Sequence, residues 1–237
     1  MSTHALGRRE HRHVGVFSVS PHWAWLAGGF VVAFALPFLV ADVLGTNRDL
    51  FYGVYAIAVA GLFALWSRKT GYDLVAAVRR RWIAALVLGL TAAAVLAVMV
   101  VRTEDGTARP DGVELVGAVV WRGIVYGVMD GLLLSVFPIL VVFAAFAGSR
   151  LNRRFAGKVA IGAVALVASL AMTGVYHAGY SDFRSDKITK PLTGDAIWSV
   201  PTLLTLNPIG APIAHVGLHT SAVLHSYETD TFLPPHE

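Results

Sequence analysis

The sequence predicts an all-α protein built as a polytopic transmembrane helical bundle with about six spans. Of its 237 residues, 56% are hydrophobic and only 14% are charged, whereas a soluble domain carries roughly a quarter charged residues. Several apolar runs reach the roughly 20 residues that a helix needs to cross a bilayer. One segment is expected to be broken or re-entrant, so the predicted range is about six to eight spans.

Charge and cysteine content limit the classes of function. The formal net charge of +4 comes from Lys and Arg that cluster between the apolar runs, as the positive-inside bias of membrane proteins predicts. The predicted partner is therefore the lipid bilayer and not nucleic acid. The chain has no cysteine, which excludes disulfides, thiolate catalysis and metal sites with cysteine ligands.

The chain divides into one membrane domain and two polar tails. Residues 1–20 are polar and rich in Arg and His, so we expect a disordered tail in the cytoplasm. Residues 21–228 form the single transmembrane domain. Residues 229–237 are predicted to be a polar C-terminal tail.

The first three spans are separated by short polar connections. They are expected at about residues 23–40, 50–66 and 82–101. The connection at 67–81 is strongly basic and is therefore placed on the cytoplasmic surface. The connection at 103–112 is acidic and rich in turn residues, so we expect it outside.

The segment 113–147 allows two interpretations. It is mostly apolar but contains Glu114, Arg122 and Asp130. The next connection, 149–158, is basic and should be cytoplasmic, which requires an odd number of crossings. Either one long, kinked helix crosses once, or a re-entrant or interfacial helix precedes a true span.

The last third of the chain contains the broken segment. A span at about 159–176 is followed by a polar loop at 178–195, and a short apolar piece at 197–206 ends at Asn207-Pro208. The last span then runs to about Tyr227. Six crossings place the protein in the plasma membrane with both termini in the cytoplasm, and seven or eight crossings are the alternative.

A row of glycines predicts close helix packing. Gly123, Gly127 and Gly131 are spaced four apart, which puts them on one helix face as a small-xxx-small ridge. We expect Gly127 to pack directly against another helix, and the ridge is also a candidate contact for partner membrane proteins.

Ionisable groups in membrane helices are costly and are usually paired or functional. His215 and His219 are four residues apart, so on a helix they share one face about one turn apart. We expect Arg122, His177 and the two histidines to line one cavity near the outer leaflet. Arg122 should bind a carboxylate, Glu114 or Asp130, or else backbone carbonyls. The candidate site residues are Arg122, Asp130, His177, His215 and His219.

Three motifs occur in the order Trp121-Arg122-Gly123-Ile-Val-Tyr-Gly127, Val175-Tyr176-His177 and Gly210-Ala-Pro-Ile-Ala-His215-Val-Gly-Leu-His219. They resemble the motifs of the CAAX-protease and bacteriocin-processing (CPBP) family of intramembrane proteases. The resemblance covers about half of the chain, roughly 113–225, and it implies peptide hydrolysis inside the membrane.

The sequence departs from the family pattern at the catalytic positions. Gly117 and Ala118 stand where the family has two glutamates, Thr173 replaces an aromatic residue, and His219 replaces an asparagine. Without the glutamates the presumed general base is missing, and Glu114 and Asp130 are the candidate substitutes. The resemblance therefore implies either a divergent hydrolase or an inactive one.

Two other classes of function follow from the histidines. Helical His-xxx-His is a common half of a zinc or iron site, and His177, His215 and His219 are the candidate ligands, with Asp130 as an alternative for His177. Two imidazoles on facing helices would also bind haem. A non-catalytic role as a subunit of a membrane complex, with histidines that only bond to neighbouring helices, is the third class.

Overall fold

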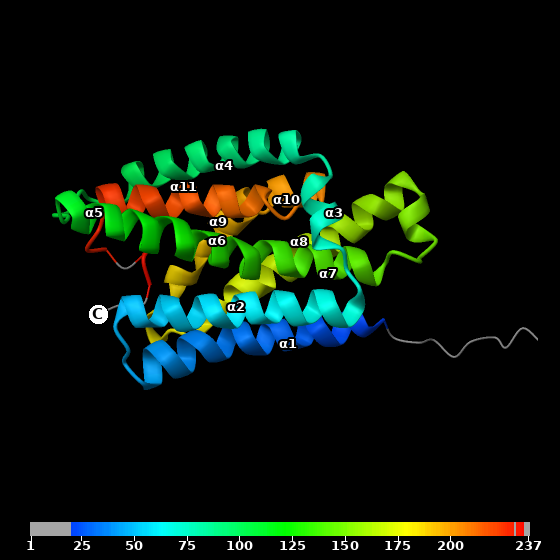
Figure 1. Cartoon of the computed structure of the whole chain (residues 1–237), viewed down its shortest axis with the longest axis horizontal. Helices are drawn as coiled ribbons and strands as arrows, with labels where there is room; N and C mark the ends of the chain where they lie inside the picture. The colour runs from blue at the N-terminus through cyan, green and yellow to red at the C-terminus, as the bar shows by residue number, and fades with distance from the viewer. Residues whose placement is uncertain (1–19, 230, 235–237) are drawn as a thin grey trace, which may run out of the picture.

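The described part of the chain is a bundle of helices. A computed structural model describes residues 20–229 and 231–234 (Figure 1), and every regular element within these ranges is helical. Residues 1–19, which make up most of the predicted N-terminal tail, lie outside this description. The predicted all-α helical bundle is confirmed.

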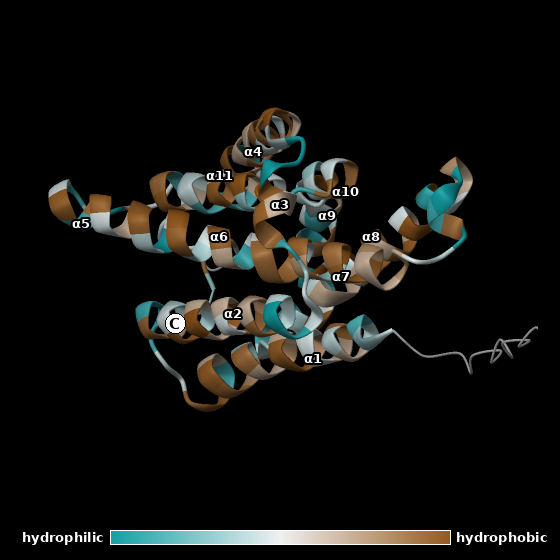
Figure 2. Cartoon of the chain, turned by 45° about the vertical axis from the view of Figure 1, so that its right-hand side comes forward, coloured by the Kyte–Doolittle hydropathy of each residue, from teal (hydrophilic) through white to brown (hydrophobic). Residues whose placement is uncertain are grey.

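Five helices are long and apolar enough to cross a membrane. They are α1 (Pro21–Ala35) with its π-helical continuation (Leu36–Val43), α2 (Arg48–Thr70), α4 (Trp82–Thr103), a continuous helix containing α5, α6 and α7 (Gly112–Ala145), and α8 (Phe155–Ala178). Their outward faces are apolar (Figure 2), and Ile57 on α2 and Val167 on α8 are 77% and 64% exposed. Such surface is unusual in water, so the helices fit a polytopic membrane protein.

Local signals in the sequence set the ends of α2 and α3. The Asn47 side chain accepts a hydrogen bond of 2.9 Å from a first-turn N–H of α2, as expected of an N-cap residue. Gly71 ends α2 with a φ of 71°, a left-handed conformation that costs glycine little. Asp73 then caps the short helix α3 (Leu74–Arg79) through a bond of 2.8 Å. The chain thus turns twice before α4 begins.

Most of the basic residues between the spans lie at one end of the bundle, which we call the basic end. Helix α2 ends there, and α4 and α8 begin there. The arginines and lysines of this end are Arg68, Lys69, Arg79, Arg80, Arg81, Arg150, Arg153, Arg154 and Lys158. The other ends of α2, α4 and α8 define the opposite end.

Residues Gly112–Ala145 form one helix that runs the length of the bundle. It contains two π-helical segments, Val119–Val125 and Leu132–Val136, with α6 (Tyr126–Gly131) between them and α7 (Phe137–Ala145) after them. The segment is therefore one long helix, as the first interpretation predicts, and its length and composition suit a single crossing. Short π segments inside α-helices are frequent at functional sites, and Asp130 lies between these two.

The chain then enters the bundle as a broken helix. α9 (Thr189–Trp198) begins inside the predicted loop 178–195, next to the end of α4, where Lys190 and Glu104 pair at 3.2 Å. α10 (Val200–Thr205) continues towards the basic end. The break predicted at Asn207 is confirmed, because Leu206 adopts a left-handed conformation and the Asn207 side chain donates to the carbonyls of Val78 and Arg80.

Helix α11 (Gly210–His225) returns through the middle of the bundle, between α4 and α6 (Figure 1). Gly123, Gly127 and Gly131 face it: a Cβ atom added at Gly127 would lie 2.9 Å from the Cα atom of Val216. The predicted direct packing of Gly127 against a helix is confirmed. The ridge is filled by the chain's own α11. It therefore does not offer the surface for a partner protein that the sequence suggested.

The structure describes part of the predicted polar C-terminal tail, and residues 230 and 235–237 lie outside the described residues. Residues 231–234 fold back onto the bundle, and Phe232 and Leu233 are buried. α11 ends at the opposite end, where His225 Nε2 lies 3.1 Å from the Glu104 carbonyl. α1 begins at the basic end, where Trp66 donates to His22.

Candidate functional site

Polar groups from three helices meet at Asp130, which is 5% exposed. Its Oδ1 atom accepts a hydrogen bond of 2.9 Å from the hydroxyl of Tyr55 on α2. Its Oδ2 atom lies 3.2 Å from His215 Nδ1 and 3.2 Å from His219 Nε2, both on α11. We call these four residues the Asp130 cluster.

The packing of α6 against α11 explains why these side chains meet. His215 and His219 lie one turn apart on the same face of α11. Gly127 and Gly131 on α6 have no side chain, so the backbone of α11 approaches them directly. The glycine row therefore brings both imidazoles to the carboxylate of Asp130.

The hydrogen bonds of His219 fix where its ring proton lies. Nδ1 is 2.7 Å from the carbonyl oxygen of Phe232. A carbonyl only accepts, so Nδ1 carries a proton and donates it. In the neutral ring Nε2 then presents a lone pair to Asp130 Oδ2, which is also an acceptor. Two acceptors at 3.2 Å repel each other unless a cation, either a proton or a metal ion, lies between them.

His215 is fully buried, and neither of its ring nitrogens makes a hydrogen bond to any residue that the structure describes. Its Nδ1 approaches Asp130 Oδ2 at 3.2 Å, but without hydrogen-bond geometry. Its ring packs on Trp198 at a centroid distance of 4.3 Å. A buried polar group with no partner costs about 1–3 kcal/mol, so this arrangement favours a ligand that the ring nitrogens would bind.

Asp130, His215 and His219 form a potential set of metal ligands. One ligand atom from each lies within 4.8 Å of the others. Ligands of a tetrahedral ion with bonds of about 2.0–2.1 Å are about 3.3 Å apart, close to the two contacts at Asp130 Oδ2. The third separation, between the two histidine nitrogens, is within the same 4.8 Å. Carboxylate and imidazole ligands suit zinc and ferrous iron.

A small cavity of about 20 Å³ adjoins the cluster. Its lining includes Asp130, His219, Tyr126 and His177, together with Phe232 from the segment after α11. This volume is enough for about one water molecule. A metal ion at Asp130 would thus have room for one small ligand that does not come from the protein.

His177 lines the same cavity but is not part of the potential ligand set. Its Nδ1 lies 2.8 Å from the Thr173 carbonyl, one turn earlier on α8. Its ring packs against Phe183 at a centroid distance of 4.9 Å. His177 and His219 therefore line one cavity, whereas the potential ligand set contains Asp130 in the place that the three-histidine prediction gave to His177.

Arg122 does not join the cluster. It forms a bidentate ion pair with Asp49 at the start of α2, at 3.0 and 2.8 Å, and its guanidinium lies 5.0 Å from the ring centre of Tyr227. The expected pairing with Glu114 or Asp130 does not occur. Arg122 precedes Asp130 by eight residues, about 12 Å along the helix, and lies nearer the opposite end of the bundle.

The sequence analysis missed four tyrosines around the site. Tyr55 bonds to Asp130, and the hydroxyls of Tyr126, Tyr176 and Tyr180 form a chain with distances of 2.7 and 2.8 Å. All four side chains are buried. The available signal was their position: Tyr55 and Tyr126 lie inside apolar helices, whereas membrane tyrosines usually lie at the interfaces.

A second buried polar cluster lies beside the first. Asp195 Oδ1 accepts hydrogen bonds from Ser199, Ser169 and Ser135 at 2.6, 3.0 and 3.4 Å. Trp198, on the same helix, separates it from His215. Asp195 was assigned to a polar loop, and the missed signal was its spacing of four from Ser199, which suits one face of a helix.

Comparisons with known proteins leave the family of this chain undetermined. No protein-family model, no curated protein and no solved structure matches it. The geometry is informative about the CPBP resemblance all the same. Gly117 and Ala118 supply no carboxylate, and Arg122 is bound to Asp49 away from the histidines. The functional argument for this chain therefore rests on the Asp130 cluster.

Proposed function

We propose that this polytopic membrane protein binds one divalent transition-metal ion within its helical bundle, through Asp130, His215 and His219. The observation that carries the proposal is the orientation of His219. Its Nδ1 is committed to the Phe232 carbonyl, so the lone pair of Nε2 points at a carboxylate oxygen 3.2 Å away. Histidine ligands of metal ions commonly donate their second N–H to a carbonyl or carboxylate in this way.

A metal ion accounts for the contacts better than a proton does. A single added proton lets His219 Nε2 donate to Asp130 Oδ2, but the approach of His215 Nδ1 to the same oxygen lacks hydrogen-bond geometry, whichever ring nitrogen of His215 carries its proton. One metal ion accepts electron pairs from both rings and from the carboxylate at once. Two histidines and one carboxylate occur in catalytic zinc sites and in non-haem iron sites, so zinc and ferrous iron are the candidate ions.

The haem alternative is not supported by the geometry. His215 and His219 lie on one helix with ring centroids 5.9 Å apart, not on facing helices. The adjoining cavity of about 20 Å³ is far smaller than the roughly 300–1,000 Å³ of typical cofactor pockets.

Hydrolysis is the second candidate function. A bound zinc ion acidifies a coordinated water molecule and so generates a nucleophile, and the cavity beside Asp130 has the volume of about one water molecule. The resemblance to intramembrane proteases supports the same class of reaction. The C-terminal residues Thr231, Phe232 and Pro234 and the start of α9 cover this cavity, so a substrate would require them to move.

The arginine distribution supports a plasma-membrane orientation with the basic end in the cytoplasm. α1 begins at this end, and α11 ends at the opposite end (Figure 1). In this orientation the chain enters the bundle from the cytoplasm, and residues after α11 lie outside. We propose this orientation in place of the expected one, in which both termini are cytoplasmic.

The decisive experiment is the metal content of the protein, purified in detergent with an affinity tag that contains no histidine. After incubation with zinc or ferrous salts and desalting, we expect about one ion per chain by elemental analysis. Asp130→Asn, His215→Ala and His219→Ala should each abolish binding. His225→Ala is the matched control, because His225 lies on the same helix but bonds to the Glu104 carbonyl.

His177→Ala distinguishes the two ligand sets. Retained metal supports Asp130 as the third ligand, and lost metal supports the three-histidine set. Absence of bound metal in the wild type under all these conditions would overturn the proposal. Peptidase activity is then tested only on preparations with known metal content.

A further inference from the structure

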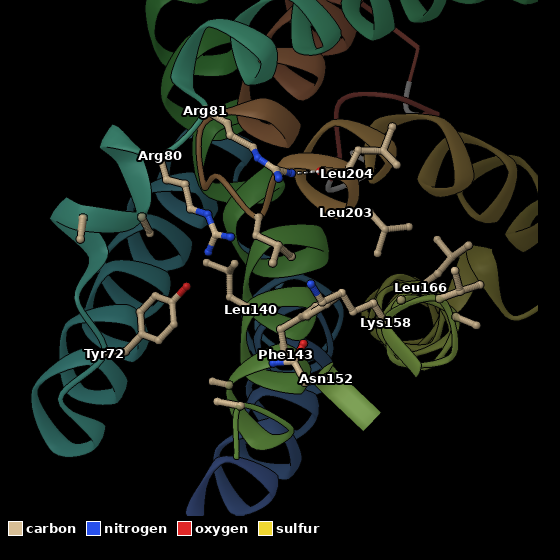
Figure 3. A pocket seen from close by; sticks show the side chains of 18 of the residues that line it. Tyr72, Arg80, Arg81, Leu140, Phe143, Asn152, Lys158, Leu166, Leu203 and Leu204 are labelled. Atoms are coloured by element: carbon tan, nitrogen blue, oxygen red, sulfur yellow. Dashed lines mark hydrogen bonds between the residues drawn. The ribbon is translucent and has the colours of Figure 1, made fainter. Parts of the chain in front are cut away.

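A large cavity of about 1030 Å³ lies at the basic end of the bundle (Figure 3). It is lined by the segment that includes α3, by the end of α7, by the start of α8 and by α10. It shares no lining residue with the small cavity beside Asp130. Its contents are therefore a separate question from the metal site.

The lining of this cavity has two chemically different parts. Leu140 and Phe143 on α7, Leu166 on α8 and Leu203 on α10 form apolar walls. Arg80, Arg81 and Lys158 line it from the basic connections and from the first turn of α8 (Figure 3). The cavity thus combines apolar surface with cationic groups.

The cationic groups are only weakly compensated. Arg81 donates to the Leu204 carbonyl at 3.3 Å, and neither Arg80 nor Lys158 has an ion-pair partner within residues 20–229 and 231–234. Asp73 also lines the cavity, but its carboxylate caps α3. An anion bound between Arg80 and Lys158 would neutralise these two positive charges.

The backbone around these groups is held in place. The Asn207 side chain donates to the carbonyls of Val78 and Arg80 at 2.7 and 2.6 Å, which ties the connection after α3 to the turn before α11. Arg80 and Arg81 of this connection line the cavity together with Leu140 and Phe143 of α7. The site is preformed and does not depend on a free loop.

The cavity opens towards the lipid-facing side of the bundle. Phe155 and Val159 at the start of α8 are 84% and 56% exposed, and Leu204 on α10 is 58% exposed. Trp82, at the start of α4, is 52% exposed, as expected of an aromatic residue at a membrane interface. The cavity therefore lies at the level where lipid headgroups meet acyl chains.

We propose that this cavity is a binding site for an anionic phospholipid. Its phosphate lies between Arg80 and Lys158, within reach of Arg81, and an acyl chain lies against Leu140, Phe143 and Leu203. Basic pockets between helices on the cytoplasmic side of membrane proteins recognise anionic headgroups in this way. Charge complementarity selects an anionic lipid, and the apolar walls select a lipid over a soluble phosphate.

The test uses the full-length protein, delipidated in a neutral detergent, and measures its Tm with added lipid. Phosphatidylglycerol at a large excess over Kd should raise Tm by roughly 5 °C, whereas phosphatidylcholine should not. Equal shifts with both lipids would overturn charge recognition. An equal shift with inorganic phosphate or glycerol phosphate would assign the site to a soluble anion and overturn the lipid proposal.

A pair of variants locates the binding. Arg80→Gln with Lys158→Gln should weaken phosphatidylglycerol binding by roughly 30-fold, since both charges next to the phosphate are removed. Arg68→Gln with Lys69→Gln is the matched control, because these residues lie at the same end but do not line the cavity. Equal loss in both double variants would show a general surface effect and overturn the site. The comparison of lipids on the wild type stands even if a variant fails to fold.

Discussion

The Nε2 atom of His219 lies 3.2 Å from Oδ2 of Asp130, across the contact between α11 and α6. The two residues are 89 positions apart in the sequence, and they lie on different helices that are packed together. At this distance the carboxylate oxygen and the imidazole lone pair repel each other unless a cation lies between them. The metal proposal follows from this contact. The first prediction concerns the group that supports the carboxylate.

Tyr55→Phe should weaken metal binding by about 10–100-fold, the usual effect of removing a group that bonds to a metal ligand. The hydroxyl of Tyr55 donates to Oδ1 of Asp130, so its loss leaves the carboxylate free to rotate. The free energy of unfolding should fall by only about 1 kcal/mol, since the ring is retained. Metal titration followed by elemental analysis measures the first effect, and thermal unfolding measures the second.

The matched control for this change is Tyr52→Phe. Tyr52 lies on the same helix and is also buried, but its hydroxyl has no hydrogen-bond partner in the described part of the chain. Metal affinity should not change in this variant. Similar losses of affinity in the two variants would mean that the tyrosines act through helix packing and not through Asp130.

Gly127→Leu should destabilise the bundle strongly. A Cβ atom at this position would lie 2.9 Å from the Cα atom of Val216 and 3.1 Å from the carbonyl carbon of His215. Because these are backbone atoms, α11 as a whole must move, and we expect a cost of about 3 kcal/mol or more, at or beyond the upper end of overpacking effects. Metal binding should be lost as well, because His215 and His219 move with α11.

Gly117→Leu provides the comparison, since within the described residues no atom outside the backbone of its own helix and its chain neighbours lies within 4 Å of a Cβ atom added there. Tm measured in the same detergent should fall by many degrees for Gly127→Leu and hardly at all for Gly117→Leu. Equal Tm values for Gly127→Leu and the wild type would show that α6 and α11 are not in contact.

The glycine row illustrates how far the sequence alone leads. Spacing of four predicts that one face of a helix is smooth, and the structure confirms that Gly127 packs against a helix. Spacing does not say which helix fills that face. The identity of α11 as the neighbour depends on tertiary packing, and with it the meeting of Asp130 with His219.

The ion pair of Arg122 shows the same limit, because the sequence predicts that a partner exists but not which residue it is. The energetic argument that a membrane arginine seeks a carboxylate is satisfied, but by Asp49 on α2 and not by a residue on its own helix. Asp195 was placed in a loop because the sequence before it is polar, yet its carboxylate is buried and accepts hydrogen bonds from the buried Ser199 and Ser169. Hydropathy predicts that helices form, and it carries no information about their neighbours.

Arg122→Gln should therefore leave metal binding unchanged. The Arg122 side chain is 16% exposed and that of Asp49 is 53% exposed, so the ion pair is largely screened by solvent, and its loss should lower stability by about 1 kcal/mol or less. Asp49→Asn should give a loss of similar size. Loss of metal in Arg122→Gln alone would indicate that Arg122 contributes to the Asp130 cluster after all.

The final prediction concerns the orientation of the chain, for which single cysteines are informative because the chain has none. A cysteine at Asn152, in the basic connection before α8, should be protected from an impermeant reagent in intact cells, since basic connections remain in the cytoplasm. A cysteine at Glu228, just after α11, should be labelled, because α11 ends next to Glu104 at the opposite end. Lysed cells supply the control in which both positions react.

Protection of both positions in intact cells would favour the arrangement with both ends in the cytoplasm. In that case α9, α10 and α11 would not together cross the membrane and return. Labelling at Asn152 but not at Glu228 would invert the molecule and remove the assignment of the basic end to the cytoplasm.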